Sequence, residues 1–393
     1  MVRLAQTWGC PLLPALKRLL CPEVNRSALF IHFLFLSPTI QCVELRNISG
    51  EDDRAVGSLL CTLSYEVPSL QRLVLCDGIS KESLSYVTQL INLQSLELLQ
   101  LGFILDPQFI GKLASLPHLE TLSLDLEEYE YSTFPAHGGF RALKHFTITA
   151  PFPMVEDILT DISSELMSLA ITGLPAVGWT GDEDWIGDCT SLFEIISRQW
   201  QASCVDITID HSRHWYDSNL MPMAALSPLF QLSNLECFKM NSFDLAIVTD
   251  DEIRQFAMAW PLLKSLHLPF KPDGSILIPT LGSLYTLAKH CPGLRSLCIP
   301  LTTAPIPALP ADKSAVHYLR SLMIGSIVEP LGLPDLLLVA RHLDSLFPQL
   351  QTLECLVAQS TDTWGKIFTM IQTFRAVRVD DLDLYHNPKD VSR

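Results

Sequence analysis

The chain has 393 residues, of which 48% are hydrophobic and only 18% charged. This composition excludes an intrinsically disordered protein, because it supplies enough apolar surface for a core. The formal net charge of −16, from 43 acidic and 27 basic residues, argues against a nucleic-acid partner, because binding to phosphates requires clustered Lys and Arg. The acidity favours a basic protein as partner, or else simply keeps an apolar protein in solution.

Neither a signal peptide nor a membrane span is predicted. Two prolines and two basic residues interrupt the apolar residues of positions 1–20. The most apolar run, residues 28–36, is far shorter than the roughly 20 residues that a membrane-spanning helix needs. The eleven cysteines are scattered without paired spacing, so we expect reduced thiols and a cytoplasmic or nuclear location.

One short pattern recurs along the chain: Leu, two variable residues, Leu, one variable residue and Leu, often preceded by Pro. Pro68–Leu75 and Pro117–Leu124 are clear examples. Thirteen copies have their first apolar residue at Leu16, Ile40, Leu70, Leu93, Leu119, Leu143, Leu166, Cys204, Leu235, Leu263, Leu294, Leu319 and Leu350. The spacing varies from 23 to 38 residues and averages about 28, which is typical of leucine-rich repeats.

The repeats predict an α/β leucine-rich-repeat solenoid, a horseshoe of about 13 irregular repeats, with parallel strands on the concave face and helices on the convex face. In each copy the last two apolar residues face the core, and the first anchors the turn into the strand. We expect a tail at residues 1–12, the solenoid at 13–356, and a capping helix with a polar tail at 357–393.

The segments between the strands carry helix signals. Asp106-Pro107 is a helix start, and Thr249 with Glu252 predicts a capping box. The longest interval, between copies eight and seven, predicts an inserted loop that contains Trp179 and Trp185. Near the C-terminus, the apolar residues Trp364, Ile367, Phe368, Ile371 and Phe374 predict the capping helix, and Asp380, Asp381 and Asp383 fall in the polar tail.

The residues that flank the inward-facing pairs are expected to form the binding surface on the concave face. As partner-binding residues we select Arg72, Glu97, Asp125, His145, Asp206, Asp210, Lys239 and His267. The four acidic members, together with the loop 127–131, predict an acidic stripe for a basic ligand. The alternative is that these carboxylates are simply solvated.

No catalytic motif is recognisable. The chain lacks a Gly-x-Ser-x-Gly elbow and the spacing of a phosphate-binding loop. The two histidines of Asp210–His214 do not have the helical spacing of a zinc site, and no motif singles out a cysteine nucleophile. We therefore expect no enzyme activity, no cofactor and no metal.

The stretches Pro68–Leu75, Pro117–Leu124, Val339–Pro348 and Trp364–Val379 together resemble fungal F-box proteins with irregular leucine-rich repeats. The resemblance spans roughly residues 12–380. It implies substrate recognition in a cullin-type ubiquitin ligase, in which an F-box docks onto a Skp adaptor and the repeats hold a protein substrate. No F-box is recognisable before Leu16, so Skp adaptor and cullin are expected only if an F-box is supplied upstream. The alternative is a free-standing acidic binder or inhibitor of a basic protein.

Overall fold

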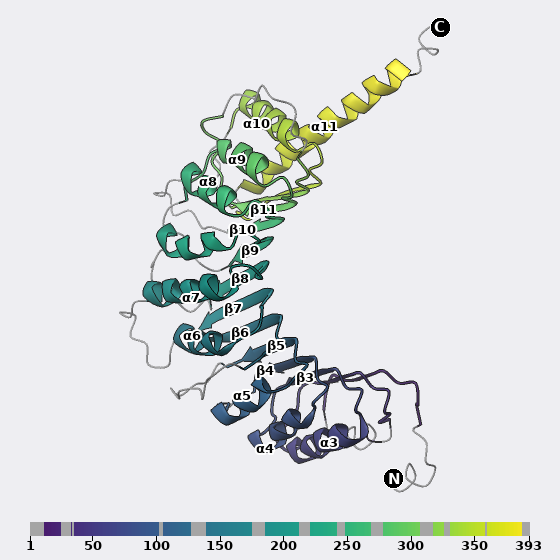
Figure 1. Cartoon of the computed structure of the whole chain (residues 1–393). Helices are drawn as coiled ribbons and strands as arrows, with labels where there is room; N and C mark the ends of the chain where they lie inside the picture. Colours follow the sequence, from purple (N-terminus) through teal and green to yellow (C-terminus); the bar gives the residue numbers. More distant parts are fainter. Residues whose placement is uncertain are drawn as a thin grey trace. The chain divides into compact units, whose positions relative to one another are not determined.

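The computed structural model describes residues 12–24, 33, 35–101, 105–126, 139–174, 185–211, 221–241, 248–268, 278–306, 317–325, 331–357 and 360–386. The chain divides into two compact units, Met1–Cys204 and Val205–Arg393. Each unit repeats the same plan, in which a short strand is followed by a helical segment, and the helices lie on one side of the strands (Figure 1).

The first unit contains seven of the described strands. They are β1 (Arg18–Cys21), β2 (Cys42–Leu45), β3 (Arg72–Cys76), β4 (Ser95–Leu99), β5 (Thr121–Asp125), β6 (His145–Pro151) and β7 (Ser168–Leu174). Its helices are α3 (Asp53–Glu66), α4 (Lys81–Leu84), the 3-10 helix η1 (Ser85–Gln89), α5 (Pro107–Ala114), α6 (Phe152–Asp161) and α7 (Trp185–Trp200).

The second unit contains the remaining six described strands. They are β8 (Asp206–His211), β9 (Cys237–Met240), β10 (Ser265–His267), β11 (Ser296–Ile299), β12 (Ser321–Ile324) and β13 (Thr352–Cys355). Its helices are the 3-10 helix η2 (Met223–Gln231), α8 (Asp250–Ala259), α9 (Gly282–His290), α10 (Leu333–Leu346) and α11 (Thr361–His386).

Within each unit the strands follow one another in chain order, and all neighbours are parallel. Each of the thirteen predicted copies coincides with one strand. The two apolar residues of each strand stack on those of the next: Leu96 aligns with Leu122 and Leu98 with Leu124, and all four are at most 1% exposed. The prediction of an α/β leucine-rich-repeat solenoid is confirmed.

A backbone hydrogen-bonding arrangement recurs where each strand begins. The carbonyl of Gln41 accepts from the N–H groups of both Gln71 and Arg72, one repeat further along the chain, at 2.9 Å each. The carbonyls of Gln71 and Glu120 accept two N–H groups from their following repeats in the same way. The carbonyl group at this position of each repeat therefore accepts its hydrogen bonds from N–H groups of the next repeat.

The predicted helix starts are present. Asp106 Oδ1 accepts from the N–H of Gln108 at 2.9 Å, with Pro107 as the first residue of α5. At α8, the Glu252 carboxylate accepts from the Thr249 N–H at 2.9 Å and completes the capping box. Caps of this kind satisfy the N–H groups that a helix leaves unpaired in its first turn.

The predicted inserted loop is wrong at its C-terminal end, where residues 185–200 form α7, and residues 175–184 lie outside the described part of the chain. Much of the extra length forms α7, whose Leu192, Phe193 and Ile196 are fully buried. These positions have the spacing of one apolar helix face, so the segment packs as a longer convex element. Trp185 is the first residue of α7, and Trp179 lies outside the described residues.

Helix α11 covers the last strand, β13. It packs against this strand and against α10. Trp364, Ile367 and Ile371 are fully buried, as the apolar spacing predicts. The helix continues to His386, so Asp380, Asp381 and Asp383 are helical and do not belong to a tail. The reason is that no Pro or Gly occurs between Lys366 and His386 to end the helix.

Arg375 of α11 connects the capping helix to the backbone of the last repeat. Its guanidinium donates to the carbonyl oxygens of Leu350 at 2.5 Å and Phe347 at 3.0 Å. It also pairs with the Asp344 carboxylate at 3.1 Å, which Arg378 holds at 2.7 Å. Because Asp344 is 6% exposed, these two cations compensate the burial of its charge.

Replacing Leu122 by Ala tests the register of the stacked leucines. The change empties a fully buried position, so we expect the free energy of unfolding to fall by about 2–5 kcal/mol. Ser123→Ala, at the next position, which is partly exposed, serves as the control and should stay within about 0.5 kcal/mol. Urea unfolding followed by circular dichroism measures both, and superimposable curves for the two variants would contradict the register.

Two buried histidines predict how stability depends on pH. His317 Nε2 donates to the Cys291 carbonyl at 2.9 Å, and Nδ1 accepts from the Leu319 N–H at 3.2 Å, so the ring is held neutral. Burial lowers the pKa of His317 and of His342 below the ordinary value of 6.5. The unfolded chain therefore binds protons first as the pH falls below 6.5.

We expect the free energy of unfolding to be highest above pH 6.5 and to fall below it, by at most about 1.4 kcal/mol per pH unit for each histidine. The double variant His317→Gln/His342→Leu should show a flatter profile between about pH 7 and 5. His118→Gln, at an exposed position, is the matched control. A double variant with the slope of the control would refute the role of these histidines.

Candidate protein-interaction surface

The strand face is the face of the sheet opposite the helices, formed by the residues that alternate with the inward-facing pairs. In β4 and β5 every second side chain is buried, and Ser95, Glu97 and Ser123 between them are partly exposed. The parallel register aligns these side chains in rows that cross the strands, with neighbours about 4.8 Å apart. Such rows form a regular surface.

Arg72 and Glu97 lie at neighbouring positions of this face in the first unit. Arg72 Nη2 donates to the Glu97 carboxylate at 2.7 Å, and both side chains remain partly exposed. The pair neutralises one of the carboxylates predicted for the acidic stripe. Val74, which lies between the two inward-facing leucines of β3, is fully buried and offers no contact area.

Asp125 and His145 are on adjacent strands, but the register separates them. Asp125 aligns with Thr149 and His145 with Thr121, at opposite ends of β5 and β6. Four residues along a strand correspond to about 13 Å. The first unit therefore presents these two side chains at different edges of the strand face and does not combine them in one site.

The second unit gathers three of the predicted residues on β8, β9 and β10. Asp206 aligns with Cys237, and Lys239 aligns with His267 one row further along the strands. The Cys237 thiol is hydrogen-bonded to Asp206, and its pKa is raised to about 11, first by burial and then by the charge of Asp206. At neutral pH this sulfur is a protonated thiol, which is a poor nucleophile.

His267 is partly buried beside Lys239, which is exposed. Burial lowers the pKa of His267, and the positive charge of Lys239 lowers it further. A neutral imidazole both donates and accepts a hydrogen bond. Asp206, Lys239 and His267 therefore present an anion, a cation and a neutral polar group on three adjacent strands.

The acidic stripe is divided between the two units. Glu97 and Asp125 belong to the first unit, and Asp206 and Asp210 belong to the second. Neither unit contains all four carboxylates, and the loop 127–131 lies outside the described residues. The stripe as a single basic-ligand site thus stays a prediction.

Three cysteines were not assigned to the strand face in the sequence analysis. Cys76, Cys237 and Cys298 occupy flanking positions of β3, β9 and β11, where the motif leaves the residue type open. Burial raises the pKa of Cys76 to about 11 and that of Cys298 to about 12. Their position in the repeat is the signal that could have placed them on this face.

The described residues were also compared with the requirements of disulfide bonds, metal sites and membrane spans. None of their ten cysteines forms a disulfide bond. No group of three or more His, Cys, Asp and Glu within them is arranged to hold a metal ion. The two histidines within residues 210–214 are His211 and His214. His211 is the last residue of β8, and His214 lies outside the described residues. No helix in the described part of the chain is long and apolar enough to cross a membrane.

Comparison with known proteins yields no family model and no curated protein sequence that matches the chain. Among solved structures, the chain is similar to a leucine-rich-repeat protein of Leptospira interrogans, at 14% sequence identity. The similarity covers 90% of this chain and 80% of that protein, with a TM-score of 0.36. The fold assignment rests on the repeat and its parallel strands, which are independent of this similarity.

The raised pKa of Cys237 leads to a prediction about its reactivity. At about pH 7.5 only a very small fraction of this thiol is ionised, so iodoacetamide should alkylate it at least about tenfold more slowly than a free cysteine peptide. The rate should rise steadily as the pH approaches 11. Mass spectrometry of the Cys237 peptide over time measures this rate, and alkylation as fast as that of the free peptide at neutral pH would contradict the pKa.

Proposed function

We propose that the chain is a non-catalytic protein-interaction module that binds its partner on the strand face. The observation that carries this proposal is that Asp206, Lys239 and His267 lie on three adjacent strands in two neighbouring rows, with Lys239 exposed and the other two partly exposed. A surface that offers an anion, a cation and a neutral hydrogen-bonding group suits a broad polar contact with another protein. The eight predicted residues are the proposed contact set.

The chemistry of the strand face supports binding in preference to catalysis. A catalytic cysteine needs a lowered pKa, whereas the pKa of Cys76, Cys237 and Cys298 is raised. The absence of disulfide bonds among the ten described cysteines supports a location in a reducing compartment, such as the cytoplasm or the nucleus. Under this proposal the protein requires no cofactor.

A more specific version is substrate recognition within a cullin-type ubiquitin ligase. The resemblance of Pro68–Leu75, Pro117–Leu124 and Trp364–Val379 to fungal F-box proteins supports it. The Skp adaptor and cullin would then join through an F-box supplied upstream. The second candidate is a free-standing binder of a basic protein, favoured by 43 acidic against 27 basic residues.

Charge reversal on the strand face tests the proposed surface. In one double variant Glu97 and Asp125 become Lys, and in another Asp206 and Asp210 become Lys, so each unit is tested separately. Because rim charges steer association and discriminate partners, we expect at least one double variant to recover its partner about tenfold less. Affinity purification of the full chain with quantitative mass spectrometry measures the recovery.

Asp157→Lys/Glu194→Lys is the matched control, because both residues are exposed on helices of the first unit. Circular dichroism must show native spectra for all variants. Equal recovery from both strand-face variants and the control would refute the strand face as the binding surface. Recovery of a Skp adaptor and a cullin would support the ligase version, and recovery of a basic protein without them would support the free-standing binder.

A further inference from the structure

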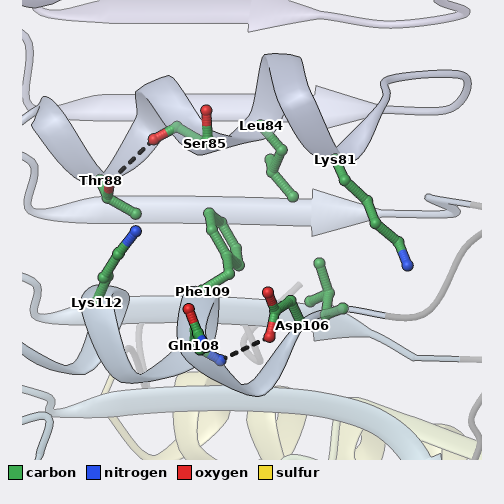
Figure 2. A pocket seen from close by; sticks show the side chains of 9 residues that line it. Lys81, Leu84, Ser85, Thr88, Asp106, Gln108, Phe109 and Lys112 are labelled. Carbon is green, nitrogen blue, oxygen red and sulfur yellow. Dashed lines mark hydrogen bonds between the residues drawn. The ribbon is translucent and has the colours of Figure 1, made fainter.

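A cleft lies on the helical side of the first unit, between the repeat of α4 and η1 and the repeat of α5. Figure 2 shows Lys81 and Lys112 at its opposite ends and Phe109 between them. The lining residues are Lys81, Leu84, Ser85, Thr88, Leu105, Asp106, Gln108, Phe109 and Lys112. The strand face lies on the other side of the sheet, so the cleft is separate from the surface discussed above.

The size of the cleft limits what it can accept. Its volume of about 120 Å³ is slightly smaller than the roughly 150 Å³ cavity that holds a benzene molecule. Sites for drug-sized molecules and cofactors are larger, on the order of 300–1,000 Å³. The cleft therefore has room for a single apolar side chain, which a peptide can supply while the rest of it remains outside.

The floor of the cleft is apolar. Leu84, Leu105 and Phe109 are at most 9% exposed. The cleft lies where α4 and η1 of one repeat face α5 of the next, and Phe109 lines it. An apolar side chain that enters here would gain contact with the ring and the leucine.

The rim of the cleft carries a local charge that is opposite to that of the whole chain. Lys81 and Lys112 are exposed at its ends, in a protein whose net charge is −16. Lys112 takes part in none of the ion pairs of the described residues. The only acidic lining residue, Asp106, accepts the Gln108 N–H with its Oδ1 as the cap of α5.

The hydroxyl groups of the rim are oriented by their own helix. Ser85 Oγ donates to the Glu82 carbonyl at 2.6 Å, and Thr88 Oγ1 donates to the Ser85 carbonyl at 2.9 Å (Figure 2). Because each hydroxyl has already used its hydrogen, its oxygen lone pairs are left to accept. A peptide lying along the rim can donate its backbone N–H groups to them.

We propose that this cleft binds an acidic linear segment of a partner protein. One apolar side chain of the segment inserts against Phe109 and Leu84, and carboxylates on either side of it pair with Lys81 and Lys112. Charge complementarity selects this occupant, because the two cations flank a space that holds one apolar side chain. The site is a second interaction surface, independent of binding on the strand face.

Titration of the full chain with labelled model peptides tests the proposal. The probe is a fluorescein-labelled Glu-Glu-Leu-Glu-Glu peptide. Two comparison peptides carry the same label: one has Ala in place of Leu, and the other is Lys-Lys-Leu-Lys-Lys. Fluorescence anisotropy measures saturable binding to the unmodified protein and to Lys81→Glu/Lys112→Glu. The matched control, Lys144→Glu/Lys289→Glu, changes the net charge equally at exposed lysines outside the cleft.

We expect the acidic peptide to bind the reversed variant about tenfold more weakly than the control variant. The Lys-rich peptide should bind the reversed variant better than the unmodified protein, and the Ala peptide should bind the unmodified protein more weakly than the Leu peptide. Thr88→Trp, which fills the cleft, should abolish saturable binding. Equal affinity of the acidic peptide for the reversed and control variants, or no saturable binding to the unmodified protein, would overturn the proposal.

Discussion

The structure depends on one constraint: the backbone polar groups of a repeat are satisfied by the next repeat. The carbonyl of Gln41 receives two N–H groups from Gln71 and Arg72, and the same arrangement recurs along each unit. A strand of four or five residues has no partner within its own repeat, so a repeat is stable only in the stack. In the last repeat, Arg375 of α11 donates to two other backbone carbonyls, those of Phe347 and Leu350.

The same stacking decides what each face of the sheet can do. On the strand face the parallel register holds side chains in rows at the strand spacing, so function depends on which residue each repeat contributes. In the second unit these contributions are Asp206, Lys239 and His267. On the helical side, α4 and α5 of consecutive repeats enclose the cleft that Phe109 lines.

The electrostatics of the strand face are those of a binding surface. Burial raises the pKa of Cys76, Cys237 and Cys298 and lowers that of His267, so these four side chains are neutral at physiological pH. The Arg72–Glu97 pair is exposed at the surface, where such pairs contribute little to stability. Specificity for a partner therefore depends on the arrangement of mixed charges and hydrogen-bonding groups.

The sequence by itself determined the repeat, the thirteen strands, the inward-facing pairs such as Leu96 and Leu98, and the caps at Asp106 and Thr249, because each follows from local periodicity or local hydrogen bonding. Only the tertiary structure decided that Val74 is buried, that Arg72 pairs with Glu97, and that Asp125 and His145 lie apart, because these depend on the register between repeats and on side chains that meet across them. The cleft between α4 and α5 also required the structure, since it arises from two convex elements that belong to different repeats.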